Sequence, residues 1–194
     1  MNFITALFFD IIRDEEETFH LLKSFFINGK FGIIFKNGLS KLKDYFIILE
    51  KMIYLFLPKI YHKLIVNQIQ VSFFSSPYFV TLFANIYYFH QENANIFLLH
   101  SLDDFILNGW CSIFSTIICI LKYFEKKILQ LNGEELIKFM VNDIGKCELF
   151  TNENYNIYYK LKKRNWIKRE LLECLEEEIK IEKDIKEELS NSSL

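Results

Sequence analysis

Apolar residues recur every three or four positions along most of this chain, which is the period of an amphipathic α-helix. The pattern predicts that loops connect these helices over 29–38, 67–74 and 142–156. An all-α fold with many helices follows. The predicted helices cover 1–12, 42–56, 60–66, 76–86, 91–108 and 110–121, with others opening at the acidic run 14–17 and at 132–135.

Three of these helices form a central stretch with short turns between them. Ser76 before Pro77 predicts a helix start, because a hydroxyl caps free N–H groups and Pro needs no hydrogen-bond acceptor at the first position. Asn108-Gly109 predicts a stop, since Gly adopts the left-handed conformation without a Cβ penalty. Short turns favour antiparallel packing. We expect the helix over 91–108 to bury one side that carries Ile96, Leu99, Leu102, Phe105 and Ile106.

Two further sites have the sequence of a capping box. Asp14 stands three residues before Glu17, and Asn132 stands three residues before Glu135. In this motif the first side chain accepts a hydrogen bond from a free backbone N–H in the first turn of the helix. The second side chain accepts one from the backbone N–H of the first residue. Each pair therefore predicts the start of a helix. In the first of these helices, we expect the inward side chains Phe19, Leu22 and Phe26, with Leu21 and Phe25 beside them.

The C-terminal part differs in character from the rest. Residues 157–189 carry a sparse apolar stripe among dense charges of both signs, which predicts one long charged amphipathic helix. This helix either packs on the domain by one edge and is otherwise solvated, or it forms a coiled-coil arm for a partner. Residues 190–194 are predicted to be a disordered tail.

The composition limits the possible classes of protein but does not indicate an activity. A length of 194 residues with 51% hydrophobic and 25% charged residues suits one globular domain. A net charge of −2 gives no reason to expect nucleic acid as a partner. The uncharged runs 69–89 and 105–121 raise a multi-span membrane protein as an alternative. The first run is polar for a span and the second is short, so this alternative ranks last.

Residue types that form metal, redox or catalytic sites in other proteins are scattered along this sequence. The cysteines have no zinc or redox spacing, and we expect reduced thiols, no metal and no cofactor. Asp103 and Asp104 are neighbours on a helix, so their side chains diverge, and Asp103 is expected to make a structural hydrogen bond. Tyr78 and Trp110 are expected in the core. The four cysteines are Cys111, Cys119, Cys147 and Cys174.

Two segments of the central stretch resemble the TBC domain, the helical domain of Rab GTPase-activating proteins. Residues 76–83, SPYFVTLF, are similar to the family segment S-Q-W-F-L-T-L-F. Residues 100–110, HSLDDFILNGW, are similar to R-I-W-D-x-F-L-x-x-G-W and keep its Asp, Phe, Gly and Trp. Pro77 and Tyr78 replace Gln and Trp of the first segment, and His-Ser-Leu replaces Arg-Ile-Trp of the second.

The N-terminal third extends this resemblance. MNFITA at 1–6, DEEETFHLL at 14–22 and LPKIY at 57–61 are similar to the family's M-N-F-I-A-A, D-E-E-E-A-F-W-L-L and L-P-K-L-Y. The resemblance covers 1–141 and implies a partial TBC domain without its N-terminal helices. Six family-motif positions are expected to be structural or to face the GTPase: Asn2, Ser76, Tyr78, Asp103, Gly109 and Trp110.

The resemblance implies an activator of GTP hydrolysis by a Rab-type small GTPase. Family members use an Arg from I-x-x-D-x-x-R and a Gln from Y-x-Q, and both motifs precede M-N-F-I-A-A. We find neither pattern in this sequence: Arg13, Arg164 and Arg169 stand in other contexts. We therefore expect no catalytic residue and weak or no activation by this chain. The alternative is a Rab-binding or scaffold protein without catalysis.

The resemblance also implies a place in the cell and a physical property. A Rab partner implies a cytoplasmic protein at the periphery of endomembranes, and the oligomeric state stays open. The first helix is apolar almost all round, which requires cover on more than one side. We expect this chain alone to expose a contiguous apolar patch and to aggregate.

Overall fold

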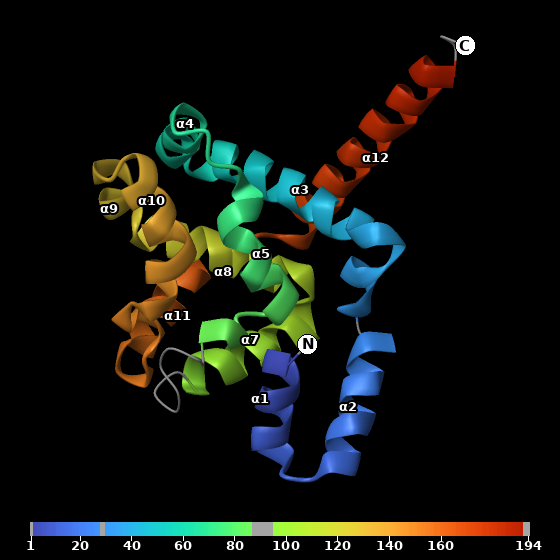
Figure 1. Cartoon of the computed structure of the whole chain (residues 1–194), viewed down its shortest axis with the longest axis vertical. Helices are drawn as coiled ribbons and strands as arrows, with labels where there is room; N and C mark the ends of the chain where they lie inside the picture. Colours follow the sequence, from blue (N-terminus) through green and yellow to red (C-terminus); the bar gives the residue numbers. More distant parts are fainter. Residues whose placement is uncertain (1, 28–29, 87–94, 192–194) are drawn as a thin grey trace.

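The computed structural model describes residues 2–27, 30–86 and 95–191. Over these residues the backbone forms α-helices and short helical turns without strands, which confirms the all-α prediction (Figure 1). No described helix combines the length and apolarity that crossing a membrane requires. The helices are α1 Asn2–Ile12, α2 Glu15–Ile27, α3 Ser40–Phe56, α4 Pro58–Val66, α5 Val71–Thr81, α7 Asn95–Asn108, α8 Trp110–Tyr123, α9 Glu125–Gln130, α10 Gly133–Lys138, α11 Tyr155–Arg164 and α12 Arg169–Asn191.

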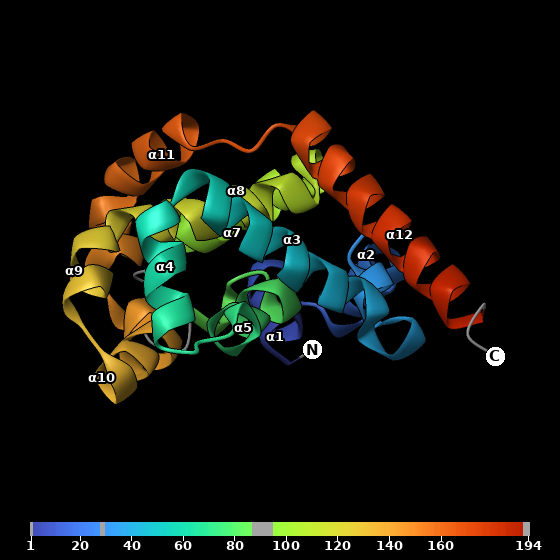
Figure 2. The same ribbon diagram turned by 90° about the horizontal axis from the view of Figure 1, so that it is seen from above.

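Helix α8 lies at the centre of the molecule. It contacts α3, α5, α7 and α11, and residues 110–121 are all buried (Figures 1 and 2). Its polar side chains are satisfied within the helix, because Ser115 Oγ donates to Cys111 O at 2.7 Å and Thr116 Oγ1 to Ser112 O at 2.8 Å. Its buried apolar side chains include Ile113, Phe114, Ile117, Ile118 and Leu121, which recur at helical spacing.

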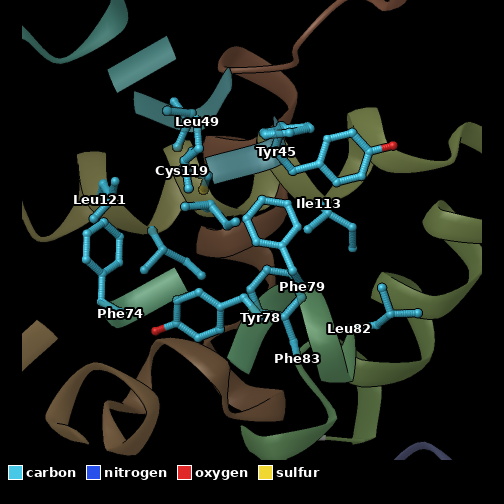
Figure 3. Packing of buried hydrophobic residues seen from close by; sticks show 14 of the residues in the cluster. Tyr45, Leu49, Phe74, Tyr78, Phe79, Leu82, Phe83, Ile113, Cys119 and Leu121 are labelled. Atoms are coloured by element: carbon cyan, nitrogen blue, oxygen red, sulfur yellow. The ribbon is translucent and has the colours of Figure 1, made fainter. Parts of the chain in front are cut away.

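Aromatic rings fill the space between α3, α5 and α8. Tyr45 lies with its ring centroid 5.5 Å from that of Phe114 and 6.0 Å from that of Phe79. Figure 3 shows Tyr45, Phe79 and Ile113 together in this cluster. The first pair is edge-to-face and the second is stacked, and rings at these distances add to the energy of burial. This cluster therefore ties three helices that are far apart in sequence into one core.

Helices α1 and α2 form a hairpin at one end of the molecule (Figure 1). Asp14 Oδ1 accepts from the Glu17 N–H at 2.8 Å, which confirms the predicted cap. The expected inward face of α2 is partly wrong. Phe19 is 62% exposed, while Thr18 and Phe25 are buried. Only one side of this short helix meets the core, and it contains Phe25, whose ring lies 5.4 Å from that of Phe8 in α1.

The predicted start of α5 is wrong. The helix begins at Val71, so part of the expected connector 67–74 is helical and Pro77 lies in the helix interior. Pro77 cannot donate to the carbonyl oxygen of Phe73, four residues earlier. Phe73 is 55% exposed, so its carbonyl oxygen has access to solvent. Ser76 Oγ donates to Ser72 O within the helix rather than capping it.

The C-terminal region is two helices rather than the single one expected over 157–189. Helix α11 ends at Arg164 and α12 begins at Arg169. In the break, the Ile167 N–H donates to Ser115 Oγ of α8 at 2.8 Å, and the Asn165 side chain donates to Leu161 O at 2.8 Å. The Asn165 backbone N–H also donates to Leu161 O, which closes the last turn of α11, and the Ile167 N–H has Ser115 in place of a helical acceptor. The long charged helix is α12, which runs beside α3 (Figure 2).

Two smaller expectations differ in detail. Asn132 precedes α10 but does not cap it: its Oδ1 accepts from Lys63 Nζ of α4 at 2.7 Å. The expected loop 142–156 contains short helical turns, and Ile144 and Phe150 are buried there. Residues 192–194 of the expected tail and residues 91–94 of the expected helix 91–108 lie outside the described residues.

Candidate functional site

The six family-motif positions have different surroundings. Tyr78, Gly109 and Trp110 are buried, and Ser76 is half-buried. Asp103 is exposed on α7. Asn2 lies at the start of α1, and its side chain is outside what the structure describes. Among the described side chains of this set, Asp103 is therefore the exposed one.

Gly109 makes the turn between α7 and α8. Its φ of 62° and ψ of −143° belong to a region that is nearly restricted to glycine. The Gly109 N–H donates to Phe105 O at 2.7 Å, which closes the last turn of α7. The prediction that Asn108-Gly109 stops this helix is confirmed.

Trp110 fixes this turn to the N-terminal part of the chain. Its Nε1–H donates to Lys30 O at 3.2 Å. Its ring centroid lies 4.8 Å from Tyr45, 5.1 Å from Phe105 and 6.1 Å from Phe31. A buried Trp with a satisfied N–H contributes chiefly to packing. The Gly-Trp pair is thus a structural device that places the end of α7 beside α2.

The outer face of α7 is apolar around one carboxylate. Exposed fractions rise along it from 39% at Ile96 and 40% at Leu99 to 62% at Ile106 and 75% at Leu107. We call this face the α7 ridge, made of Ile96, Leu99, Asp103, Ile106 and Leu107. Exposed apolar groups that lie together mark interaction surfaces.

The expected inward side of this helix is therefore partly wrong. Of the five side chains predicted to be inward, Leu102 and Phe105 are buried, whereas Ile96, Leu99 and Ile106 are exposed. The buried side is completed by Phe97, Leu98 and Ser101. Helix α7 carries apolar residues on nearly all sides, so the spacing alone did not determine which side faces the core.

A cleft of about 420 Å³ lies beside the ridge, between α2 and α7. Its walls are apolar, and Lys30 brings a positive charge to it. No motif in the sequence pointed to this cleft, because its two sides are 80 residues apart and meet through Phe25 and Phe105, whose ring centroids lie 5.7 Å apart. The lining residues are Leu21, Ser24, Phe25, Lys30, Phe105, Ile106, Leu107 and Gly109.

An ion pair between a buried Lys and a partly exposed Asp holds α7 to α11. Lys162 Nζ lies 2.7 Å from Asp104 Oδ2, and the Lys162 side chain is only 5% exposed. Burial lowers the pKa of Lys162, and the hydrogen bond to Asp104 opposes that shift. The structure thus shows a structural hydrogen bond at Asp104 rather than at Asp103, where it was expected.

The described residues offer little reactive chemistry. Burial raises the pKa of the Cys119 thiol to about 12, and burial likewise raises that of Cys111. Such thiols are poor nucleophiles at neutral pH. Among the described residues, no three His, Cys, Asp or Glu side chains gather as a metal site would require. The candidate site is the α7 ridge with its adjoining cleft, where exposed apolar side chains lie together.

Comparison with known proteins bears on this surface. A family model, the Rab-GTPase-TBC domain, matches residues 1–129 of the 194. The match includes the α7 ridge, the Gly109-Trp110 turn and both sides of the cleft. No curated protein matches the chain. Since the family model covers more than half of the sequence, the chain belongs to the Rab-GTPase-TBC domain family.

Proposed function

We propose that residues 1–194 bind a Rab-type small GTPase through the α7 ridge and the adjoining cleft. The proposal rests chiefly on Asp103, which is the exposed residue among the described family-motif side chains and lies among exposed apolar side chains. Interfaces combine an apolar centre with a few polar groups that fix orientation. Ile106 and Leu107 supply the apolar centre, and Asp103 and Lys30 supply charges of opposite sign.

The shape of the site supports this assignment. The ridge stands on a helix that Trp110 and the Lys162–Asp104 ion pair hold at two points. A rigid helix presents its side chains without a large entropic cost on binding. The cleft beside it is open and apolar, and it accepts a protruding side chain from a partner.

Binding and catalysis are separate questions for these residues. In this family an Arg and a Gln finger act on the nucleotide, and an arginine finger is worth about 10³–10⁵ in rate. Arg13 lies between α1 and α2, while Arg164 and Arg169 flank the break before α12. Arg164 and Arg169 lack the I-x-x-D-x-x-R pattern. Arg13 keeps the Asp three residues before it, Asp10, but has Leu7 in place of the Ile and follows the M-N-F-I-T-A segment instead of preceding it. We therefore expect these residues to bind the GTPase with little stimulation of hydrolysis.

A Rab partner also suggests a location. Rab-type GTPases are attached to endomembranes, so the chain would be cytoplasmic and reach the membrane surface through its partner. Fractionation with and without a GTP-locked Rab that binds the chain tests this. Membrane recovery that does not depend on the GTPase would contradict it.

The main experiment measures binding by this chain to a panel of purified Rab GTPases, each loaded with GDP or with a non-hydrolysable GTP analogue. We expect selective binding to the GTP-analogue form of at least one member. The double variant Ile106→Ser/Leu107→Ser should weaken it at least about tenfold, since each buried side chain contributes about 1.5–3 kcal/mol. Val66→Ser, on the exposed end of α4, is the matched control and should bind normally.

Three results would overturn parts of this proposal. Failure to bind any member of a full panel would remove the Rab-binding function. Unchanged binding by the double variant would move the interface away from the α7 ridge. Phosphate release stimulated by 10³ or more would show that these residues supply catalytic groups in another way.

A further inference from the structure

Four of the six glycines in this sequence directly follow an asparagine. In such a pair the backbone nitrogen of the glycine can attack the side-chain amide of the asparagine, because glycine has no Cβ that hinders a close approach. The pair at 28–29 lies outside the described residues. The structure describes the other three pairs, which have the same reactive groups and different surroundings: Asn37-Gly38, Asn108-Gly109 and Asn132-Gly133.

In two of the described pairs the glycine N–H donates a hydrogen bond. The Gly109 N–H donates to Phe105 O at 2.7 Å, and Gly109 is buried. The Gly133 N–H donates to Oδ1 of Asn67, the residue that ends α4, at 2.9 Å, although Gly133 is exposed. The side chain of Asn132 is bonded to α4 as well. Attack by either glycine nitrogen therefore requires that a hydrogen bond first be broken.

The pair Asn37-Gly38 lies in an open turn directly before α3. Among the described residues, the Gly38 N–H has no hydrogen-bond acceptor and the Asn37 side chain has no hydrogen-bond partner. Every residue from 35 to 40 is exposed. No described side chain other than those of its chain neighbours lies within 4 Å of the position that a Cβ on Gly38 would occupy. Water therefore reaches this nitrogen, and no packed side chain shields it.

The backbone of this turn also favours movement. Asn37, Gly38 and Leu39 have φ of 48°, 62° and 65°, so two residues with a Cβ are in the left-handed region, which is unfavourable for them. The Leu39 N–H donates to Lys36 O at 3.1 Å, a bond between exposed residues. Rotation about the Asn37 backbone would relieve part of this strain without disturbing the core. The reacting atoms can then approach to about 3–3.5 Å.

We propose that Asn37 is a site of spontaneous deamidation in the folded chain, whereas the hydrogen bonds of the following glycines protect Asn108 and Asn132. The Gly38 nitrogen loses its proton to solvent and forms a bond to Cγ of Asn37. The bond from Cγ to the amide nitrogen breaks, and ammonia leaves. Water then opens the cyclic succinimide at one of its two carbonyl carbons. The net reaction consumes one water and involves no oxidation or reduction.

The two possible products alter the turn differently. Opening at one carbonyl gives aspartate, which adds a carboxylate before α3. The first turn of α3 carries no acidic residue, and a negative charge near the start of a helix is favourable. Opening at the other carbonyl gives isoaspartate, in which the main chain runs through the former side chain. Only isoaspartate therefore lengthens the backbone between Lys36 and Ser40. This modification does not depend on the proposed GTPase binding.

The test incubates the full chain at neutral pH and follows each Asn-Gly pair by peptide mapping with mass spectrometry. Digestion at acidic pH limits reaction during preparation, and the peptide that contains Asn28 is measured separately. We expect Asn37 to react at least about tenfold faster than Asn108 and Asn132, because a hydrogen bond of about 1.4 kcal/mol that must first break lowers the rate tenfold. In the urea-unfolded chain this difference should disappear, since the protecting hydrogen bonds are lost.

Two variants test the cause. Asn67→Ala removes the acceptor of the Gly133 N–H and should raise the rate at Asn132 by about 2- to 10-fold, with the rate at Asn37 as the internal control. Circular dichroism checks that this variant is folded. Asn37→Gln is the matched variant at the reactive site. Its longer side chain disfavours closure of the ring, so modification at position 37 should be lost while the rates at Asn108 and Asn132 stay the same.

Each contrary result overturns the proposal. Equal rates at the three pairs of the folded chain, or a slower reaction at Asn37 than at either other pair, would show that the turn before α3 is not selectively reactive. No reaction at Asn37 while the unfolded chain reacts fully would show that the fold protects it. A difference that persists in urea assigns the selectivity to neighbouring residues in sequence. An unchanged rate at Asn132 in folded Asn67→Ala removes the hydrogen bond as the protecting feature.

Discussion

Helices α7 and α8 have similar apolar sequences and different surroundings. Residues 110–121 of α8 are all buried, while α7 leaves Ile96, Leu99, Ile106 and Leu107 exposed. Helix α8 has neighbours on all sides, because α3, α5, α7 and α11 pack around it. Helix α7 packs on α8 and on the segment before α11, and its outer face has no cover among the described residues.

This contrast shows how to interpret a helix that has apolar residues on nearly all of its sides. Such a helix needs cover on every side. Where the chain provides neighbours, as for α8, the helix becomes the centre of the core. Where it does not, as for α7, the uncovered side is a candidate for a partner, and family membership suggests a Rab-type GTPase.

We expect the largest loss of stability from a substitution that disrupts the packing around α8. Phe114→Ala removes a fully buried ring that lies 5.5 Å from Tyr45 and 5.3 Å from Phe79. Removing a buried Phe lowers the free energy of unfolding by about 4 kcal/mol, since burial is lost and a cavity stays. Urea denaturation followed by circular dichroism measures this loss. A loss under about 1 kcal/mol would show that α8 is less tightly enclosed than its contacts indicate.

A smaller effect tests how α7 is fastened to α11. Asp104→Asn leaves the buried ammonium of Lys162 without its carboxylate, and should lower the free energy of unfolding by about 2 kcal/mol at pH 7. Lys162→Met, which removes the buried charge, should cost less. A larger loss for Lys162→Met than for Asp104→Asn would contradict an ion pair of this kind.

The same pair gives a pH dependence with a definite sign. The folded pKa of Lys162 lies below the unfolded value of about 10.4, chiefly because of burial. Between these two values the unfolded chain binds more protons, so the free energy of unfolding rises with pH. Loss of Asp104 lowers the folded pKa further and widens this window. Lys162→Met should remove the rise, which denaturation curves at pH 8 to 10.5 would show.

The sequence allowed the helical fold and several helix ends to be predicted, and it left other features open for physical reasons. Asp14 and Gly109 act locally, so their roles followed from nearby residues. The start of α5 could not be predicted from nearby residues. Pro77 is tolerated inside this helix because Phe73, whose carbonyl oxygen it leaves without a helical donor, is exposed to solvent. The break before α12 depends on Ser115, 52 residues from Ile167.

In the candidate site, too, some features could be predicted from the sequence, whereas others depend on contacts between distant segments. Motif resemblance picked out Asp103 and the buried Trp110, but not Ile106 or Leu107 as surface residues. Apolar side chains on all sides of α7 left its orientation undetermined until the contacts with α8 and Phe25 were known. The expectation of exposed apolar groups fits this face and α1, where Phe3 and Ile11 are 44% and 52% exposed. Aggregation stays a prediction.

We expect the smallest change in stability from a substitution on the exposed face of α7, in contrast to the buried helix α8. Leu107 is 75% exposed, so Leu107→Ser should change the free energy of unfolding by no more than about 0.5 kcal/mol, far below the loss for Phe114→Ala. It should nevertheless lower the fluorescence of a dye that binds exposed apolar surface, because it interrupts the α7 ridge. A loss of stability above about 1.5 kcal/mol would mean that the folded chain covers Leu107, and the ridge would then be part of the core like α8.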